Sequence, residues 1–164
     1  MGLCCSTWTK EKASSVKNVI YDDFKIPPLH GKVVAITGCT TGTGYYTALA
    51  AAKNGATVIM LNRSSDRQEV AMTKLQSEVP SGTFDFISCD LSSYKSVRAA
   101  CDALQTKYGE SGIDVMCCNA GVMALEDVAT EDGFDIQMQT NQLSHVMMIH
   151  ACWSMLEKAA AARG

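Results

Sequence analysis

The sequence predicts an α/β fold of the Rossmann type, a doubly wound parallel sheet with helices on both faces. Strand-like and helix-like segments alternate four times over residues 31–164, which is typical of such a sheet. A glycine-rich stretch, TGCTTGTG at 37–44, joins the first strand to the first helix. Pro27 and Pro28 lie near the end of a polar leader over residues 1–30 and would stop any helix there. We therefore expect the domain to begin near Gly31.

Four short apolar runs are predicted as strands, because β-branched and apolar residues suit a sheet that is buried on both faces. They are residues 32–37, 56–61, 83–89 and 113–118. Helical patterns cover 45–54, 66–78, 93–109 and 134–162, the last as one long helix. We expect the strand order 3-2-1-4, with the later strands of the fold missing. The fourth strand would then present an apolar edge, which a second copy of the chain could cover.

Charge and cysteine spacing argue against three classes of protein: nucleic-acid binders, disulfide-framework proteins and metal-site proteins. The net charge is -3 and no basic stretch stands out, so we expect no nucleic-acid partner. The eight cysteines include two adjacent pairs but no CxxC pair. This spacing favours neither a disulfide framework nor a metal site, and indicates buried thiols in a reducing compartment such as the cytoplasm.

The N-terminus carries a pattern for lipid attachment. No apolar run approaches the roughly 20 residues of a membrane helix. MGLCCS fits N-myristoylation of Gly2, and S-acylation of Cys4 and Cys5 would add a second anchor. The protein would then be cytoplasmic and held on the cytoplasmic face of a membrane. An ordinary cytosolic start that matches by chance remains the alternative.

The glycine-rich stretch has the context of a phosphate-binding loop. Glycines let the backbone approach a pyrophosphate, and the following helix N-terminus offers N–H groups and positive dipole charge. A turn that merely packs tightly is the alternative, which the strand–turn–helix context disfavours. The predicted cofactor-binding residues here are Gly38, Thr40, Thr41, Gly42, Thr43 and Gly44.

Three stretches together resemble the short-chain dehydrogenase/reductase family, in particular its retinol-dehydrogenase-like members. Residues 37–44 match TGxxxGxG, 119–121 match the end of NNAG, and 130–146 match a later stretch with T-x-DG and N-x-L-x-H. The resemblance covers about residues 31–164. The sequence departs from the family pattern at Thr43, Cys118, Gln142 and Ser144.

The resemblance implies further site residues. Asp90 and Leu91 would lie along the adenine, and the backbone carbonyl of Asn141 would hold a water in the proton relay. The residues lining the nicotinamide side would be Asn119, Ala120 and Gly121. Asp90 could also cap the next helix, and Asn141 could form a kink or an interhelical hydrogen bond. We expect His145 and His150 to be packing or dimer-contact residues.

Arg63, just after the second strand, indicates the cofactor. A binder of NAD usually offers an acid here to the ribose 2′-hydroxyl, whereas a basic group accommodates the 2′-phosphate of NADP. Residues 62–65 contain no acid. NADP(H) is therefore preferred, NAD(H) stays open, and a solvated surface arginine is the alternative.

The family's catalytic Ser and Tyr-x-x-x-Lys would follow a fifth strand, beyond Gly164. We therefore expect the cofactor-binding half of an NADP(H)-dependent oxidoreductase that interconverts small-molecule carbonyls and alcohols, with lipophilic substrates. This chain alone would be inactive. Two alternatives stay open: a non-catalytic NADP(H)-binding module or partner subunit, and an acylated adaptor with a vestigial site. Tyr21 and Lys25 also have the spacing of the catalytic pair, but they precede the first strand and match by chance.

Overall fold

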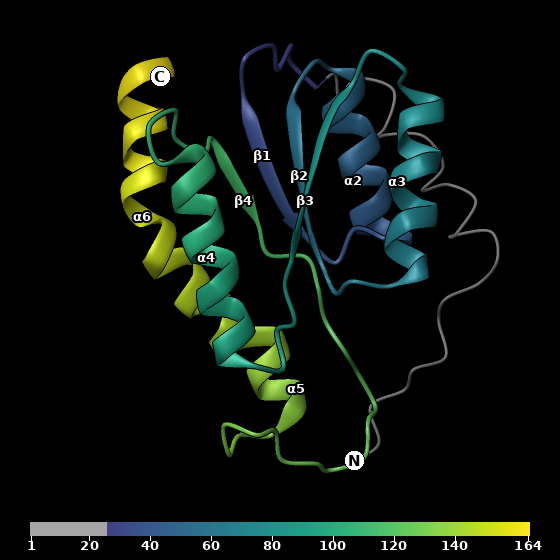
Figure 1. Ribbon diagram of the computed structural model, residues 1–164, viewed down its shortest axis with the longest axis vertical. Coiled ribbons are helices and arrows are strands. Elements are labelled where there is room, and N and C mark those ends of the chain that lie inside the picture. The colour runs from purple at the N-terminus through teal and green to yellow at the C-terminus, as the bar shows by residue number, and fades with distance from the viewer. Residues whose placement is uncertain (1–25) are drawn as a thin grey trace, which may run out of the picture.

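The computed structural model describes residues 26–164, which form a parallel sheet between two layers of helices (Figure 1). The strands are β1 (Val33–Thr37), β2 (Thr57–Asn62), β3 (Thr83–Ser88) and β4 (Val115–Cys117). The helices are α2 (Gly42–Lys53), α3 (Asp66–Glu78), α4 (Tyr94–Tyr108), α5 (Ile136–Met138), the π-helix η1 (Gln139–Leu143) and α6 (Ser144–Arg163). The order β3-β2-β1-β4, with parallel neighbours, confirms the predicted Rossmann-type α/β fold.

The central strand β1 is apolar on both faces, as predicted. Val33 and Ala35 pack into the cluster with α4 and α6, and Val34 and Ile36 pack into the cluster with α2 and α3. Figure 1 shows these helix pairs on opposite faces of the sheet. Successive side chains of a strand point to opposite faces, so one apolar run serves both cores. Full burial of a Val or Ile side chain contributes about 1.5–3 kcal/mol.

The fourth strand is shorter than the predicted 113–118. Ile113 is fully buried, and its N–H donates to the carbonyl of Met155 in α6 at 3.1 Å. It therefore packs against that helix and is not part of the β-ladder, which begins at Val115. The first helix, conversely, starts earlier than expected, at Gly42, so the end of the glycine loop is already its first turn.

The helix predicted over 134–162 runs over 136–163, but it is not α-helical throughout, because the π-helix η1 lies between the short α5 and α6. The side chain of Asn141 binds both backbone groups of Val122, accepting from its N–H at 2.7 Å and donating to its carbonyl at 2.8 Å. The ring of His145 contacts the carbonyl of Asn141 at 3.1 Å. These contacts hold the wider turn, since single π-turns interrupt α-helices where local groups satisfy the displaced bonds.

A buried carboxylate ties the amino ends of the central strands to α6. Asp114 accepts from the backbone N–H of Val33 at 2.7 Å and from Nη2 of Arg163 at 2.8 Å. Lys32 lies 3.5 Å away. Burial alone would raise the pKa of Asp114, but the hydrogen bonds from Arg163, Val33 and Lys32 outweigh it and hold the pKa below its usual value.

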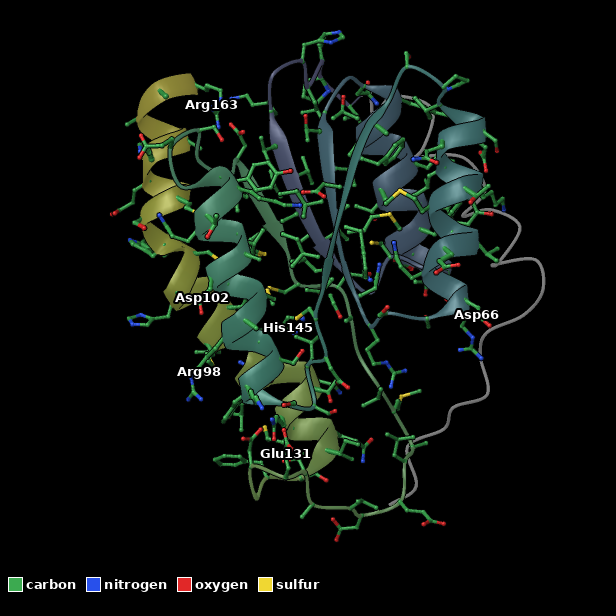
Figure 2. All side chains as sticks on the ribbon, in the orientation of Figure 1. Asp66, Arg98, Asp102, Glu131, His145 and Arg163 are labelled. Atoms are coloured by element: carbon green, nitrogen blue, oxygen red, sulfur yellow. The ribbon has the colours of Figure 1, made fainter. Side chains whose placement is uncertain are left out.

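Replacing Asp114 with Asn is expected to lower the unfolding free energy at pH 7 by about 1.5–3 kcal/mol, the size of hydrogen bonds to charged groups. The folded-state pKa is depressed, so this stabilisation is present above the unfolded pKa of about 3.9 and is lost as pH falls through the folded value. Urea denaturation at neutral and strongly acidic pH measures it. The control is Asp102→Asn, because Asp102 is exposed on α4 (Figure 2). A deficit that stays equally large in acid would contradict this account.

Candidate functional site

A cleft of about 680 Å³ opens at the carboxyl ends of the strands. It lies where the chain order reverses between β1 and β4, the position at which open parallel sheets bind ligands. Residues following all four strands line it, together with Ile136 and Thr140. The structure brings together eleven predicted site residues here: Gly38, Thr40, Thr41, Thr43, Gly44, Arg63, Asp90, Leu91, Asn119, Ala120 and Gly121.

At two of its glycines, Gly38 and Gly44, the loop passes so close to its surroundings that a side chain is excluded. Gly38 has φ +67°, and a Cβ there would lie 2.7 Å from the Cα of Ala120. A Cβ on Gly44 would collide with the carbonyl of Gly38 and the amide of Asn119. Thr41, the N-cap of α2, makes no side-chain cap hydrogen bond, and among the described residues the first turn holds no acid. This leaves helix N–H groups and dipole charge directed at the cleft, which suits a phosphate.

Two predicted residues, Gly42 and Asn141, are not among those that line the cleft. Gly42 has φ +58°, and a Cβ on it would meet nothing within 4 Å, so its backbone angle is the reason for glycine. The side chain of Asn141 is engaged with Val122, as described above. Cofactor contact by Gly42 and a catalytic role for Asn141 stay predictions.

The hydroxyl of Thr37 joins the ends of β1 and β4. It accepts from the N–H groups of Asn119 and Ala120, both at 3.0 Å. The amide of Asn119 in turn donates to the carbonyls of Thr37 and Gly38, each at 3.0 Å. These bonds fix the spacing between the glycine loop and the segment after β4, which both line the cleft.

His145 completes this junction from α6 (Figure 2). Its Nε2 lies 2.9 Å from the Thr37 hydroxyl, and its Nδ1 lies 3.1 Å from the Asn141 carbonyl. A carbonyl only accepts, so Nδ1 carries the proton and Nε2 accepts from Thr37. His145 is buried, in keeping with a packing role, whereas His150 is exposed.

Two arginines lie at the carboxyl end of β2, near the acids Asp66 and Glu69 of the first turn of α3. Arg63 and Arg67 are both exposed and both line the cleft. Neither forms a salt bridge with a carboxylate of residues 26–164. Two guanidinium groups are therefore available to an anionic ligand at this end.

Asp90 lines the cleft and is held locally. Its Oδ1 accepts from the N–H and hydroxyl of Ser92, at 2.9 and 2.7 Å. The alternative that Asp90 caps the next helix is wrong, because α4 begins at Tyr94 and its N-cap is Ser93.

Sequence reasoning did not single out Asn62, Ser65, Arg67 and Ser92, which also line the cleft. The signal for Asn62 was available: it is a polar residue at the end of an apolar strand, and a buried polar group needs partners. Arg63 precedes α3 and Arg67 lies in its first turn, so whether both face the cleft depends on where that helix starts.

Other candidate chemistry receives little support within residues 26–164. The described cysteines are free thiols, and burial raises the pKa of Cys117, which disfavours the reactive thiolate. In this range no three His, Cys, Asp or Glu side chains gather as metal ligands. Nor does any helix there have the length and hydropathy to cross a bilayer. The N-terminal acylation pattern and the Tyr21–Lys25 pair lie outside the described residues.

Together, the 3-2-1-4 parallel sheet and the cleft at its switch point define a Rossmann-type domain. The short chain dehydrogenase family model matches residues 32–163. The chain belongs to that family, and its relatives include retinol dehydrogenases.

Three similar proteins illustrate the match. A short-chain dehydrogenase/reductase of Aspergillus calidoustus, drtF, is 36% identical over 86% of this chain and 44% of its own length. Mouse retinol dehydrogenase 14 is 37% identical over 82% of this chain and 43% of its own length. The structure of L-sorbose reductase from Gluconobacter frateurii, complexed with NADPH and L-sorbose, covers 78% of this chain and 48% of that one, with a TM-score of 0.64 and 22% identity, and supports the fold. The chain thus spans less than half the length of the curated relatives it matches.

Proposed function

We propose that residues 31–164 form the NADP(H)-binding half of a short-chain oxidoreductase that interconverts carbonyls and alcohols. The observation that carries the cofactor assignment is the pair Arg63 and Arg67 at the cleft wall after β2, where an NAD-specific site would present an acid. Guanidinium groups fork onto phosphate oxygens, so these two fit the 2′-phosphate.

The remaining cleft residues fit the rest of a dinucleotide. The close approach at Gly38 and Gly44 leaves room for a pyrophosphate beside the N-terminus of α2. Asp90 and Leu91 would flank the adenine, and Asn119 to Gly121 would border the nicotinamide. When bound, the cofactor supplies or takes up the hydride. This chain's contribution is to bind and orient it.

Lipophilic carbonyls are the proposed substrate class, supported by the likeness to retinol dehydrogenases. A non-catalytic NADP(H)-binding module would show the same binding but no turnover in any form of the protein. Membrane attachment through Gly2, Cys4 and Cys5, a cytoplasmic location and homo-oligomer formation stay predictions.

Thermal unfolding with added dinucleotide tests the proposal. A ligand that binds only the folded state at a hundred times its Kd adds about 2.7 kcal/mol, or roughly 5–10 °C in Tm for a chain of this size. We expect NADPH to raise the Tm of the 164-residue chain at concentrations where NADH has little effect. No shift with either dinucleotide would contradict cofactor binding, and a larger shift with NADH would contradict the NADP(H) preference.

A further inference from the structure

Asn62 is a buried polar residue at the carboxyl end of β2, with only 6% of its surface exposed. Its Oδ1 accepts from the backbone N–H of Cys39 at 2.8 Å, and its Nδ2 donates to Oε1 of Gln68 at 2.6 Å. Nδ2 also lies 3.3 Å from the sulfur of Cys39. Although Asn62 lines the cleft, its amide is thus engaged within the protein.

The two partners of Asn62 belong to different elements beside the cleft, and neither lines it. Cys39 is inside the glycine loop, directly after Gly38. Gln68 lies in the first turn of α3, is 3% exposed, and places its own Nε2 3.8 Å from the sulfur of Met60. One side chain therefore connects the loop that approaches the pyrophosphate with the helix that follows the arginine segment.

The Asn62–Gln68 hydrogen bond joins the two ends of the segment that carries Arg63 and Arg67. Arg63, Ser65 and Arg67 line the cleft and all lie between Asn62 and Gln68 in the chain. The two arginines are exposed, and no salt bridge to a described carboxylate holds them. Within this short segment Ser65 caps α3 by accepting from the Gln68 N–H. The two buried ends of the segment bond to each other through the Asn62–Gln68 amide pair.

We propose that Asn62 is a positioning residue for NADP(H), which holds the glycine loop and the arginine segment in one fixed arrangement through Cys39 and Gln68. This inference rests on the proposed function. Asn is suited to the place because its amide accepts from a backbone N–H and donates to Gln68 at the same time. Alanine would leave the Cys39 N–H unpaired in a buried setting, and both the loop and the segment would shift to satisfy it.

The measurement is the ratio of NADPH to NADH affinity, from parallel calorimetric titrations of the 164-residue chain at one fixed salt concentration. Asn62→Ala is expected to weaken binding of both dinucleotides and to reduce the NADPH/NADH affinity ratio about tenfold, roughly one charge-assisted hydrogen bond to phosphate. Gln68→Met keeps the side-chain length and leaves the Asn62–Cys39 bond in place. It is expected to reduce the NADPH/NADH affinity ratio about threefold with little change in NADH affinity. This second variant serves if Asn62→Ala does not fold.

Tyr45→Phe is the matched control. Tyr45 is also buried, and its hydroxyl donates to Glu78 at 2.8 Å, which connects α2 to α3 away from the cleft. Its loss should lower stability and leave the affinity ratio unchanged. If both test variants keep the wild-type ratio, the inference is overturned while the proposed function stands. If the wild-type chain binds neither dinucleotide, the proposed function is overturned and the inference with it.

Discussion

Replacing Arg63 with alanine is expected to weaken NADPH binding about 10- to 100-fold and to leave NADH binding within about twofold, because hydrogen bonds between charged groups contribute about 1.5–3 kcal/mol. Arg63 lines the cleft directly after β2 and makes no salt bridge with the described carboxylates. Removing the Arg63 side chain would therefore remove a hydrogen-bond donor to the 2′-phosphate of NADPH without breaking a salt bridge within the described residues. Titration of both dinucleotides against each variant at fixed ionic strength measures the effect.

Arg67→Ala should act in the same direction, and the double variant should bind NADPH and NADH alike. Arg98→Ala is the charge-matched control, since Arg98 is exposed on α4 on the other side of the sheet (Figure 2). It changes the net charge equally but removes no cleft contact. If Arg63→Ala weakens both dinucleotides to the same extent, the arginine does not contact the 2′-phosphate and the NADP(H) assignment is wrong.

Gly38→Ala is expected to lower the unfolding free energy by about 2–5 kcal/mol. Two costs add: a left-handed backbone angle costs a residue with a Cβ roughly 1–2 kcal/mol, and overpacking adds about 1–3 kcal/mol. The added Cβ would lie 2.7 Å from the Cα and Cβ of Ala120. Relief requires the segment after β4 to move, so NADPH affinity should fall as well. Urea denaturation and NADPH titration follow the two effects.

Gly42→Ala separates the two costs. Gly42 has a similar backbone angle, φ +58°, but open space around it. Gly42→Ala should therefore lower the unfolding free energy by only about 1–2 kcal/mol, the cost of the left-handed backbone angle alone. If Gly38→Ala and Gly42→Ala lower the unfolding free energy equally, the close approach of Gly38 to Ala120 adds no cost. The segment after β4 would then move easily to accept the added methyl group.

The parts of the fold that local patterns determine were predictable from the sequence. The apolar runs of β1 and β2 and the glycine loop between strand and helix predicted a parallel sheet and the place of its cleft. Strand and helix ends were predicted less well, because tertiary contacts set them. Ile113 is apolar and next to a strand, yet its N–H bonds to α6 and not to β1.

The side-chain contacts that organise the site were not predictable, since their partners are far apart in the chain. His145 and Thr37 are separated by 108 positions, and no local pattern reports that they meet. The π-turn at Asn141 has the same origin: its helix pattern is continuous, and the contact with Val122 across a loop makes the turn wider. The motif residues were predictable because they lie at strand ends. The residues that position them through long-range hydrogen bonds, such as His145 and Asn62, are recognised in that role only in the structure.

The sheet order implies that the cleft residues after β1 and β2 and those after β4 take their places at different stages of folding. In β1, Val34 pairs with Val58 of β2, close in the chain, but also with Val115 of β4, 81 positions away. Closing the longer loop costs only about 1 kcal/mol more in chain entropy, yet such long-range pairing is what slows folding. The part of the cleft that follows β1 and β2 can form early in folding. The part that follows β4 forms only once β4 has paired with β1, the longest-range strand pair. Binding of the proposed dinucleotide would therefore report on the pairing of all four described strands and not on the first strands alone.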